Sequence, residues 1–272
     1  MLKATLSSSL IFTLAVLISL SFNITDSKGQ AEPSFSFAAD DPESDRVRNL
    51  QELVRYMDGK GFDLTPLIED ERFELYEGIT QRFTRSAERT EPTLESYKRI
   101  LGYDAKKRNI KEFITNNQDQ LIKAENEYDI PRYVIAAIIG VESDFGKNIG
   151  SHNPFNAYVS MIAEDHRANF ARAQLEELLK FTERNQLDVL ELKSSYAGAM
   201  TFAQFIPYSL NRWWVGSELF NMDNNILSVA NYLAHFKNIT GSVERAVFRY
   251  NPSQLYTDAV MSLAADAELM FR

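Results

Sequence analysis

The sequence predicts a mainly α-helical protein with little or no sheet. Apolar residues recur at helical spacing along most of the chain after residue 46, and no segment alternates convincingly at every second residue. Room for short strands remains only in residues 76–92. The 272 residues are 44% hydrophobic, so the chain can build a sizeable core in one domain or two.

The composition excludes several kinds of protein. A net charge of −9 argues against nucleic acid as the partner, whereas a neutral polymer such as a glycan stays open. The chain has no cysteine, which rules out disulfides, thiolate metal sites and a lipidated cysteine. The histidines His152, His166 and His235 are not spaced like a zinc motif, and we expect no metal and no cofactor. The 12 tyrosines suit a core and also a surface that stacks on sugar rings.

Residues 1–22 predict a signal peptide. Lys3 gives a positive start, and the apolar run Leu10–Phe22 has the length of a signal peptide rather than of a typical membrane span. No cleavage motif is sharp, so an uncleaved anchor, and membrane attachment through it, stays open. We expect an exported, periplasmic protein that is not a lipoprotein. Residues 23–44 are polar and turn-rich, which predicts a disordered linker.

The rest of the chain divides into an N-terminal helical region, residues 45–128, and a core, residues 129–272. Glycines and prolines separate the apolar stripes of the first region into predicted helices at 46–57, 67–75, 94–101 and 109–128. After a central apolar helix, the core contains predicted helices at 156–164, 168–185, 187–192, 226–236, 242–250 and 255–271. We expect the protein to be a monomer.

The central helix is predicted to begin near Pro131 and to end at Gly146. Pro131 suits a first helical turn, Asp129 suits its N-cap or first turn, and Gly146 is a natural stop. Glu142 lies four residues after Ile138, so its side chain continues the buried apolar stripe. Burial is expected to raise the pKa of Glu142, as a general acid near neutral pH requires. The alternative is that Glu142 is the polar end of a core helix that emerges into water.

Two later stretches place polar groups in unusual settings. Gln204 lies among apolar residues and follows the small residues 197–199, where a ligand or another backbone could come close. Tight helix packing around a satisfied glutamine explains this pattern equally well. The break at residues 250–253, followed by Tyr256, is either a polar aromatic site or an ordinary asparagine-proline turn.

Four segments, in order, resemble motifs of lytic murein transglycosylases of the MltB type. Residues 140–146, Gly-Val-Glu-Ser-Asp-Phe-Gly, resemble the Gly-Val-Glu-Ser/Thr-x-Trp/Phe-Gly signature of that family. Residues 192–200, together with residues 204–207, resemble its Gly-Ser-Phe-Ala-Gly-Ala-Met-Gly…Gln-Phe-Met-Pro block. Residues 228–233 resemble its Ser-Val-Ala-Asn-Tyr block, and residues 249–256 its Tyr-Asn-x-Ser…Tyr block. The resemblance extends from about residue 46 to residue 264.

The resemblance implies a lysozyme-like catalytic core with the N-terminal helical region wrapped against it. It implies action on peptidoglycan glycan strands, at the β-1,4 bond between N-acetylmuramic acid and N-acetylglucosamine, without water and with 1,6-anhydro ends as products. By position, Glu142 matches the single catalytic glutamate of the family, which acts as general acid and then as base. The positions that match substrate-binding residues are Ser195, Gln204, Asn251, Tyr97, Tyr232, Tyr250 and Tyr256. We expect Glu142 to be partly buried and to face Ser195, Gln204 and Asn251 across one cleft.

The sequence also departs from the family pattern. Thr201 stands where the family block usually has glycine, and the family's Tyr-Pro-Arg-Arg segment is shortened to Asp165-His166-Arg167. The acidic calcium-binding loop of some members is missing, so no calcium site is expected. These departures keep two alternatives open: a catalytically weakened peptidoglycan-binding or scaffold protein, and a hydrolytic muramidase.

Overall fold

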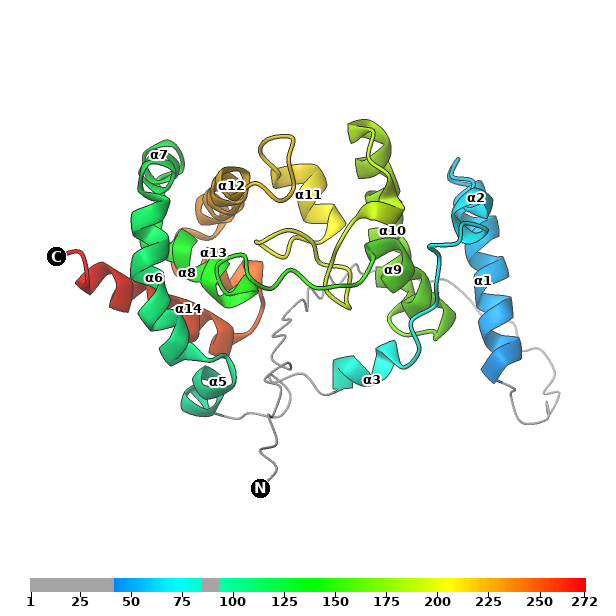
Figure 1. Ribbon diagram of the computed structural model, residues 1–272, viewed down its shortest axis with the longest axis horizontal. Helices are drawn as coiled ribbons and strands as arrows, with labels where there is room; N and C mark the ends of the chain where they lie inside the picture. The colour runs from blue at the N-terminus through cyan, green and yellow to red at the C-terminus, as the bar shows by residue number, and fades with distance from the viewer. Residues whose placement is uncertain (1–41, 85–92) are drawn as a thin grey trace, which may run out of the picture.

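The structure, a computed structural model, describes residues 42–84 and 93–272 and is almost entirely helical (Figure 1). Its first helices are α1 (Pro42–Asp58), α2 (Thr65–Ile68), α3 (Ile79–Thr84), α5 (Leu94–Ile100), α6 (Tyr103–Asn116), α7 (Gln118–Tyr128) and α8 (Arg132–Ser143). They are followed by α9 (Pro154–Ala163), α10 (Ala168–Asn185), the 3-10 helix η1 (Val189–Glu191), α11 (Pro207–Trp213), α12 (Met222–Thr240), α13 (Val243–Tyr250) and α14 (Gln254–Leu269). The described residues form isolated β-bridges in place of a sheet, which confirms the predicted fold class.

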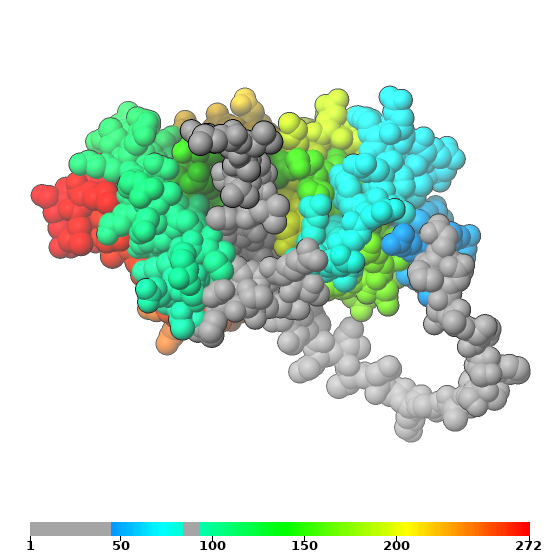
Figure 2. All heavy atoms as spheres, turned by 60° about the horizontal axis from the view of Figure 1, so that its bottom comes forward, coloured from blue at the N-terminus to red at the C-terminus, as the bar shows by residue number. Residues whose placement is uncertain are grey.

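Two groups of helices flank the middle of the molecule. Helices α1, α9 and α10 pack together on one side, and α5, α6, α8 and α14 pack together on the other (Figure 1). Helix α11 connects the two groups because it contacts α10 and also α12, which packs on α7, α8 and α13. On the face drawn in Figure 2, the α5–α7 segment and the α2–α3 segment lie at opposite sides. One connected core includes Leu53 of α1, Ile114 of α6 and Ile138 of α8, so both expected regions share it.

The expected signal peptide, residues 1–22, and nearly all of the expected linker lie outside the described residues. Within the part of the chain that the structure describes, none of the helices combines the length and the apolar character needed to cross a membrane.

The predicted helix 109–128 is two helices, α6 and α7, and α6 begins earlier than predicted. Asn117 separates them, because its φ of −117° is not helical. Its side-chain Nδ2 donates to the Phe113 carbonyl at 2.8 Å, which satisfies a carbonyl at the end of α6. An asparagine side chain that competes for backbone hydrogen bonds therefore sets this boundary.

Other predicted boundaries also differ from the structure. The predicted helix 67–75 shrinks to the single turn of α2, because the Asp70 carboxylate accepts the Arg72 amide at 2.9 Å and stabilises a turn instead. Residues 79–84, where the sequence left room for short strands, form α3. Pro207 begins α11, a helix that was not predicted.

The expected role of Asp129 at the start of the central helix was wrong. Asp129 ends α7 in a left-handed conformation with φ of 53°, and its carboxylate accepts a hydrogen bond from Lys237. The first amide of α8, that of Arg132, is instead bound by Glu125 Oε1 at 3.0 Å, and Glu125 Oε2 accepts the Arg132 guanidinium at 2.7 Å. The carboxylate of Glu125, from the preceding helix, therefore caps α8. The residues next to the start of α8 in the sequence do not indicate this cap.

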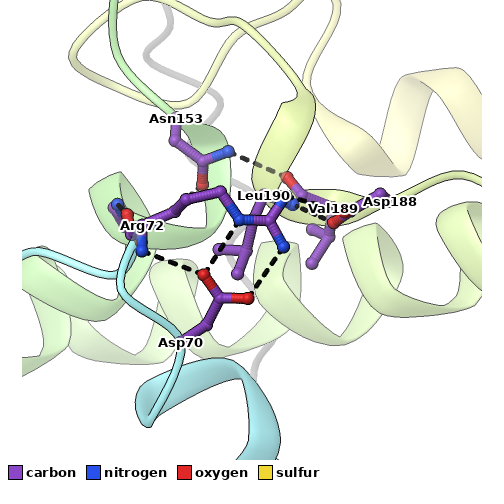
Figure 3. A network of polar contacts seen from close by, with 7 residues as sticks. Asp70, Arg72, Asn153, Asp188, Val189 and Leu190 are labelled. Atoms are coloured by element: carbon purple, nitrogen blue, oxygen red, sulfur yellow. Dashed lines mark hydrogen bonds and ion pairs between the residues drawn. The ribbon is translucent and has the colours of Figure 1, made fainter.

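An ionic network centred on Arg72 attaches the segment after α2 to η1 (Figure 3). The Arg72 guanidinium donates to both oxygens of Asp70 at 2.9 and 2.8 Å and to Asp188 at 2.8 Å. Asn153 Nδ2 also donates to the Val189 carbonyl of η1 at 2.8 Å. The hydrogen bond from Arg72 lowers the pKa of Asp70 from 3.8 to about 2, and Arg72 lowers the pKa of Asp188 as well.

Candidate active site

The turn after α8 explains the residue types of the glutamate signature. Phe145 folds back onto the helix, and a Cβ atom on Gly140 would lie 2.6 Å from the Phe145 ring. Asp144 and Phe145 have left-handed backbones with φ of 50° and 61°, and Gly146 follows with φ of 88°. Ser143 Oγ secures the turn, because it accepts the Gly146 amide at 2.9 Å. The residues of the signature therefore fix the exit of α8.

Glu142 lies in the last turn of α8 and is 8% exposed, so it is more deeply buried than expected. The Tyr256 hydroxyl of α14 donates to Glu142 Oε1 at 2.6 Å. Burial raises the pKa of Tyr256 well above its ordinary value, and the charge of Glu142 adds to the shift. The pKa of Tyr250, at the end of α13, is raised for the same two reasons. Both tyrosines therefore remain protonated hydrogen-bond donors close to the Glu142 carboxyl.

A lysine reaches the same place from α6. Lys106 is 8% exposed, and its Nζ lies 3.6 Å from Oδ1 of Asp144, two residues after Glu142. Burial lowers the pKa of Lys106, and the charges of Asp144 and Glu142 oppose this shift. Lys106 was not predicted as a site residue. One feature of the sequence indicates that Lys106 is buried: it lies four residues before the buried Ile110 and so on the same apolar stripe of α6.

Ser195 lies in a tight turn that packs closely against α9. Its backbone amide donates to the Ala199 carbonyl at 2.8 Å, and its Oγ accepts the Ala199 amide at 3.2 Å. Gly198 within this turn has φ of 78°, and a Cβ atom there would lie 2.3 Å from the Tyr158 ring. Tyr158 donates to the Gly198 carbonyl at 3.0 Å. The small residues thus accommodate a side chain of α9, and the Ser195 hydroxyl accepts a hydrogen bond from its own turn.

Gln204 and Thr201 form a second turn with an unusual backbone. Their φ values of 52° and 71° lie in the left-handed region, which a β-branched residue rarely adopts. Gln204 Nε2 donates to the Thr201 carbonyl at 3.0 Å, and Gln204 is 5% exposed. In this structure the Gln204 amide is therefore bonded within its own loop. The strain at Thr201 costs about 1–3 kcal/mol.

Tyr250 connects this second turn to the region of Glu142. Its hydroxyl donates to the Ala203 carbonyl at 2.5 Å, and Glu142 is among the charges that act on it. The Ala203 amide donates to Asn225 Oδ1 at 3.1 Å, and Asn225 Nδ2 donates to the Asn221 carbonyl at 2.7 Å. Asn225 is fully buried and was not predicted, because the helix predicted from the sequence began at residue 226, whereas α12 begins at Met222. The turn is thus held by α12 and α13.

The remaining predicted site residues lie deep in the structure. Tyr97 of α5 is fully buried, and it lies close enough to Tyr256 that ionisation of its phenol would add to the raised pKa of Tyr256. Tyr232 is 3% exposed, and its hydroxyl donates to the Arg249 carbonyl at 2.7 Å. Asn251 is fully buried at the end of α13. Tyr97 therefore belongs to the group around Tyr256, whereas Tyr232 packs inside an aromatic cluster. The single cleft expected opposite the glutamate stays a prediction.

The site thus consists of a buried glutamate at the end of an apolar helix that accepts a hydrogen bond from a buried tyrosine, within a helical fold. The chain belongs to the transglycosylase SLT domain family, whose model matches residues 50–244. This match confirms the family resemblance of the sequence motifs.

One relative is similar over part of its length. It is the membrane-bound lytic murein transglycosylase B of Escherichia coli K12, 33% identical over 127 residues, with 44% of this chain and 35% of that protein covered. The match spans about a third of the length of that relative.

Two solved structures share the fold of this chain. Soluble lytic transglycosylase SltB1 from Pseudomonas aeruginosa has a TM-score of 0.72 at 24% identity, with 83% of this chain and 99% of that chain covered. SltB3 from Pseudomonas aeruginosa, in complex with NAG-anhNAM-pentapeptide, has a TM-score of 0.68 at 18% identity, with 84% and 79% covered. These similarities confirm the predicted lysozyme-like fold.

Proposed function

We propose that this chain is a lytic transglycosylase that acts on the glycan strands of peptidoglycan. It cleaves the β-1,4 bond between N-acetylmuramic acid and N-acetylglucosamine and leaves a 1,6-anhydromuramyl end. The observation that carries the proposal is the buried carboxyl of Glu142, bound by Tyr256 at 2.6 Å, in a chain of this family. The activity in the name of the curated relative and the NAG-anhNAM-pentapeptide bound to SltB3 support peptidoglycan as the substrate class.

In the first step, Glu142 acts as a general acid. Its proton passes to the glycosidic oxygen as the bond from that oxygen to the muramyl C1 breaks. Burial favours the protonated form, because a buried carboxylate loses its hydration. The hydrogen bond from Tyr256 fixes the orientation of the carboxyl. The N-acetyl group of the substrate assists the oxocarbenium-like centre, so a second enzyme carboxylate is not required.

In the second step, the Glu142 carboxylate acts as a base. It accepts the proton of the muramyl 6-hydroxyl, and the oxygen of this hydroxyl attacks C1. Glu142 is then protonated again, and the cycle consumes no water. Water must be kept from C1, since it would give hydrolysis instead. The rings of Tyr97, Tyr250 and Tyr256, each no more than 9% exposed, support this exclusion.

The contacts to the glycan form the second part of the proposal. Gln204 binds the glycan strand: its side-chain amide gives up the hydrogen bond to the Thr201 carbonyl and donates to an acceptor on the sugar instead. The other residues proposed to bind the strand are Ser195, Asn251, Tyr97, Tyr232, Tyr250 and Tyr256. The proposed enzyme works in the periplasm as a monomer, needs no metal or cofactor and binds no nucleic acid. It attaches to the membrane only if the N-terminal segment stays uncleaved.

One observation favours a second candidate, a peptidoglycan-binding or scaffold protein with weakened turnover. The Gln204 amide is bonded to Thr201, which occupies a position that favours glycine. If this turn does not open, the glycan can bind to the protein without correct placement at Glu142.

The experiment is digestion of purified peptidoglycan, with the released muropeptides identified by mass spectrometry. We expect anhydro-ended muropeptides from the wild-type protein and from Glu112→Gln, which removes an exposed carboxylate of α6. We expect no release above background from Glu142→Gln. Wild-type protein that binds peptidoglycan and releases nothing would establish the binding alternative. Reducing-end products would identify a hydrolytic muramidase.

A further inference from the structure

Lys106 is a buried cation that the two proposed steps leave without a role. It projects from α6 toward the exit of α8, is 8% exposed, and lies 3.6 Å from Asp144 Oδ1. A buried ammonium is unfavourable unless nearby groups offset its loss of hydration. Lys107, the next residue, is an ordinary surface lysine: its side chain is 45% exposed and pairs with Asp266 at 2.9 Å. The two adjacent lysines therefore have different environments on one helix.

The position of Lys106 connects it to Glu142 in two ways. The first is mechanical, because Asp144, which Lys106 holds, is the left-handed residue that ends α8 two positions after Glu142. The second is electrostatic, because the charge of Glu142 acts on Lys106 directly. The charged and titratable groups around Glu142 and Lys106 are Asp144 and Lys147 from the exit turn, Tyr97 from α5, Tyr250 from α13 and Tyr256 from α14.

We propose that Lys106 is a positioning residue for Glu142. Its ammonium holds Asp144, and with it the turn that orients the glutamate. Its positive charge favours the carboxylate form of Glu142, the form that accepts the 6-hydroxyl proton in the second step. The hydrogen bond from Tyr256 acts in the same direction, and burial acts in the opposite direction. The catalytic part of this inference rests on the proposed function, whereas the electrostatic part concerns the free protein.

The test compares Lys106→Met, Lys106→Arg and the matched control Lys107→Met in the full chain. Two quantities are measured: the pKa of the Glu142 carboxyl by NMR of isotope-labelled glutamate without substrate, and the pH profile of kcat/KM on glycan strands. Glu142→Gln identifies the resonance. Removal of a nearby positive charge destabilises a carboxylate, so Lys106→Met raises the measured pKa of Glu142. The alkaline limb of the profile, where the acid form is lost, then moves to higher pH.

We expect Lys106→Arg and Lys107→Met to keep both quantities at their wild-type values. A folded Lys106→Met variant whose Glu142 titrates at the wild-type pH overturns the proposal, even if its turnover falls. Lys106→Gln, which keeps a hydrogen-bond donor toward Asp144 but removes the charge, answers the same question if the methionine variant does not fold. If Lys106→Met raises the pKa of Glu142 in a protein that releases no muropeptide, the positioning role of Lys106 is supported and the proposed function is rejected.

Discussion

The Tyr256 hydroxyl donates a 2.6 Å hydrogen bond to Glu142 Oε1 across 114 positions of the chain. The contact exists because α14 packs directly on α8, so its geometry is set by helix packing. Burial, followed by the charge of Glu142, holds the pKa of Tyr256 well above its ordinary value. Tyr256 therefore remains a donor at every pH at which an enzyme of this kind works, and it always orients the same carboxyl.

Tyr256→Phe removes this donor and leaves the ring. A hydrogen bond to a charged group contributes about 1.5–3 kcal/mol, so we expect kcat/KM on peptidoglycan to fall roughly 10- to 100-fold. Because the lost bond stabilises the Glu142 carboxylate, the alkaline limb of the pH profile moves upward. The control is Tyr103→Phe, which removes another tyrosine–carboxylate bond, to Asp266 at 2.9 Å, and leaves kcat/KM unchanged. Equal profiles for wild type and Tyr256→Phe would contradict the orienting role.

Tyr250→Phe tests the connection between α13 and the turn that contains Gln204. The variant leaves the buried Ala203 carbonyl without the hydroxyl that now binds it at 2.5 Å. An unsatisfied buried acceptor costs about 1–3 kcal/mol, which urea denaturation measures as a lower free energy of unfolding. Tyr56→Phe, on a residue that is 40% exposed, changes this free energy by less than about 0.5 kcal/mol. Equal losses in both variants would mean that the bond to Ala203 stabilises nothing.

Gly140→Ala tests the fit between α8 and its exit turn. The added methyl group would lie 2.6 Å from the Phe145 ring, so the ring must move, at a cost of about 1–3 kcal/mol in the free energy of unfolding. Movement of Phe145 displaces the turn after Glu142, and we expect activity to fall more than stability alone explains. Gly59→Ala is the matched control, because its nearest neighbours lie at 3.5 Å. That variant is neutral or stabilised by up to about 1 kcal/mol. A Gly140→Ala variant with wild-type stability and turnover would show that the packing of Phe145 on Gly140 does not position the exit turn.

Arg72→Met tests the network between the segment after α2 and η1. Arg72 lowers the pKa of Asp70 from 3.8 to about 2. The ion pair therefore stabilises the folded protein fully at pH values above the pKa of Asp70 in the unfolded chain, and this stabilisation is lost as the pH falls through the pKa of Asp70 in the folded protein. We expect the stability difference between wild type and Arg72→Met to be largest above about pH 4 and to vanish below about pH 2. Chemical denaturation at several pH values measures it, with Arg55→Met as the control for loss of a surface arginine. A difference that is constant over this range would show that Asp70 is not linked to Arg72.

The exit of α8 could be predicted from the sequence because its determinants are local. The spacing from Ile138 to Glu142 placed the carboxyl on a buried face, and Gly146 marked the end of the helix. The length of the apolar run around Ile138 favoured a helix over a strand for this segment. The burial of Glu142 follows from the same pattern, and the structure places it at 8% exposure.

The partners of Glu142 could not be predicted from spacing, because they arrive from other helices. Tyr256 lies far away in the sequence and reaches the carboxyl through the packing of α14 on α8, and Lys106 reaches Asp144 beside it through the packing of α6 on α8. Asp129 was assigned to the wrong helix for the same reason, since Glu125 reaches over from α7 to cap α8. The left-handed backbone of Thr201 was also hidden, because threonine gives no local signal for it.

Digestion of peptidoglycan in water enriched in heavy oxygen tests the central claim most directly, because it follows the atom that attacks C1. If Glu142 delivers the muramyl 6-hydroxyl to C1, mass spectrometry will find anhydromuramyl ends without heavy oxygen, and Glu142→Gln will release none. Reducing muramyl ends that carry heavy oxygen from the solvent would contradict this account, since water would then be the nucleophile.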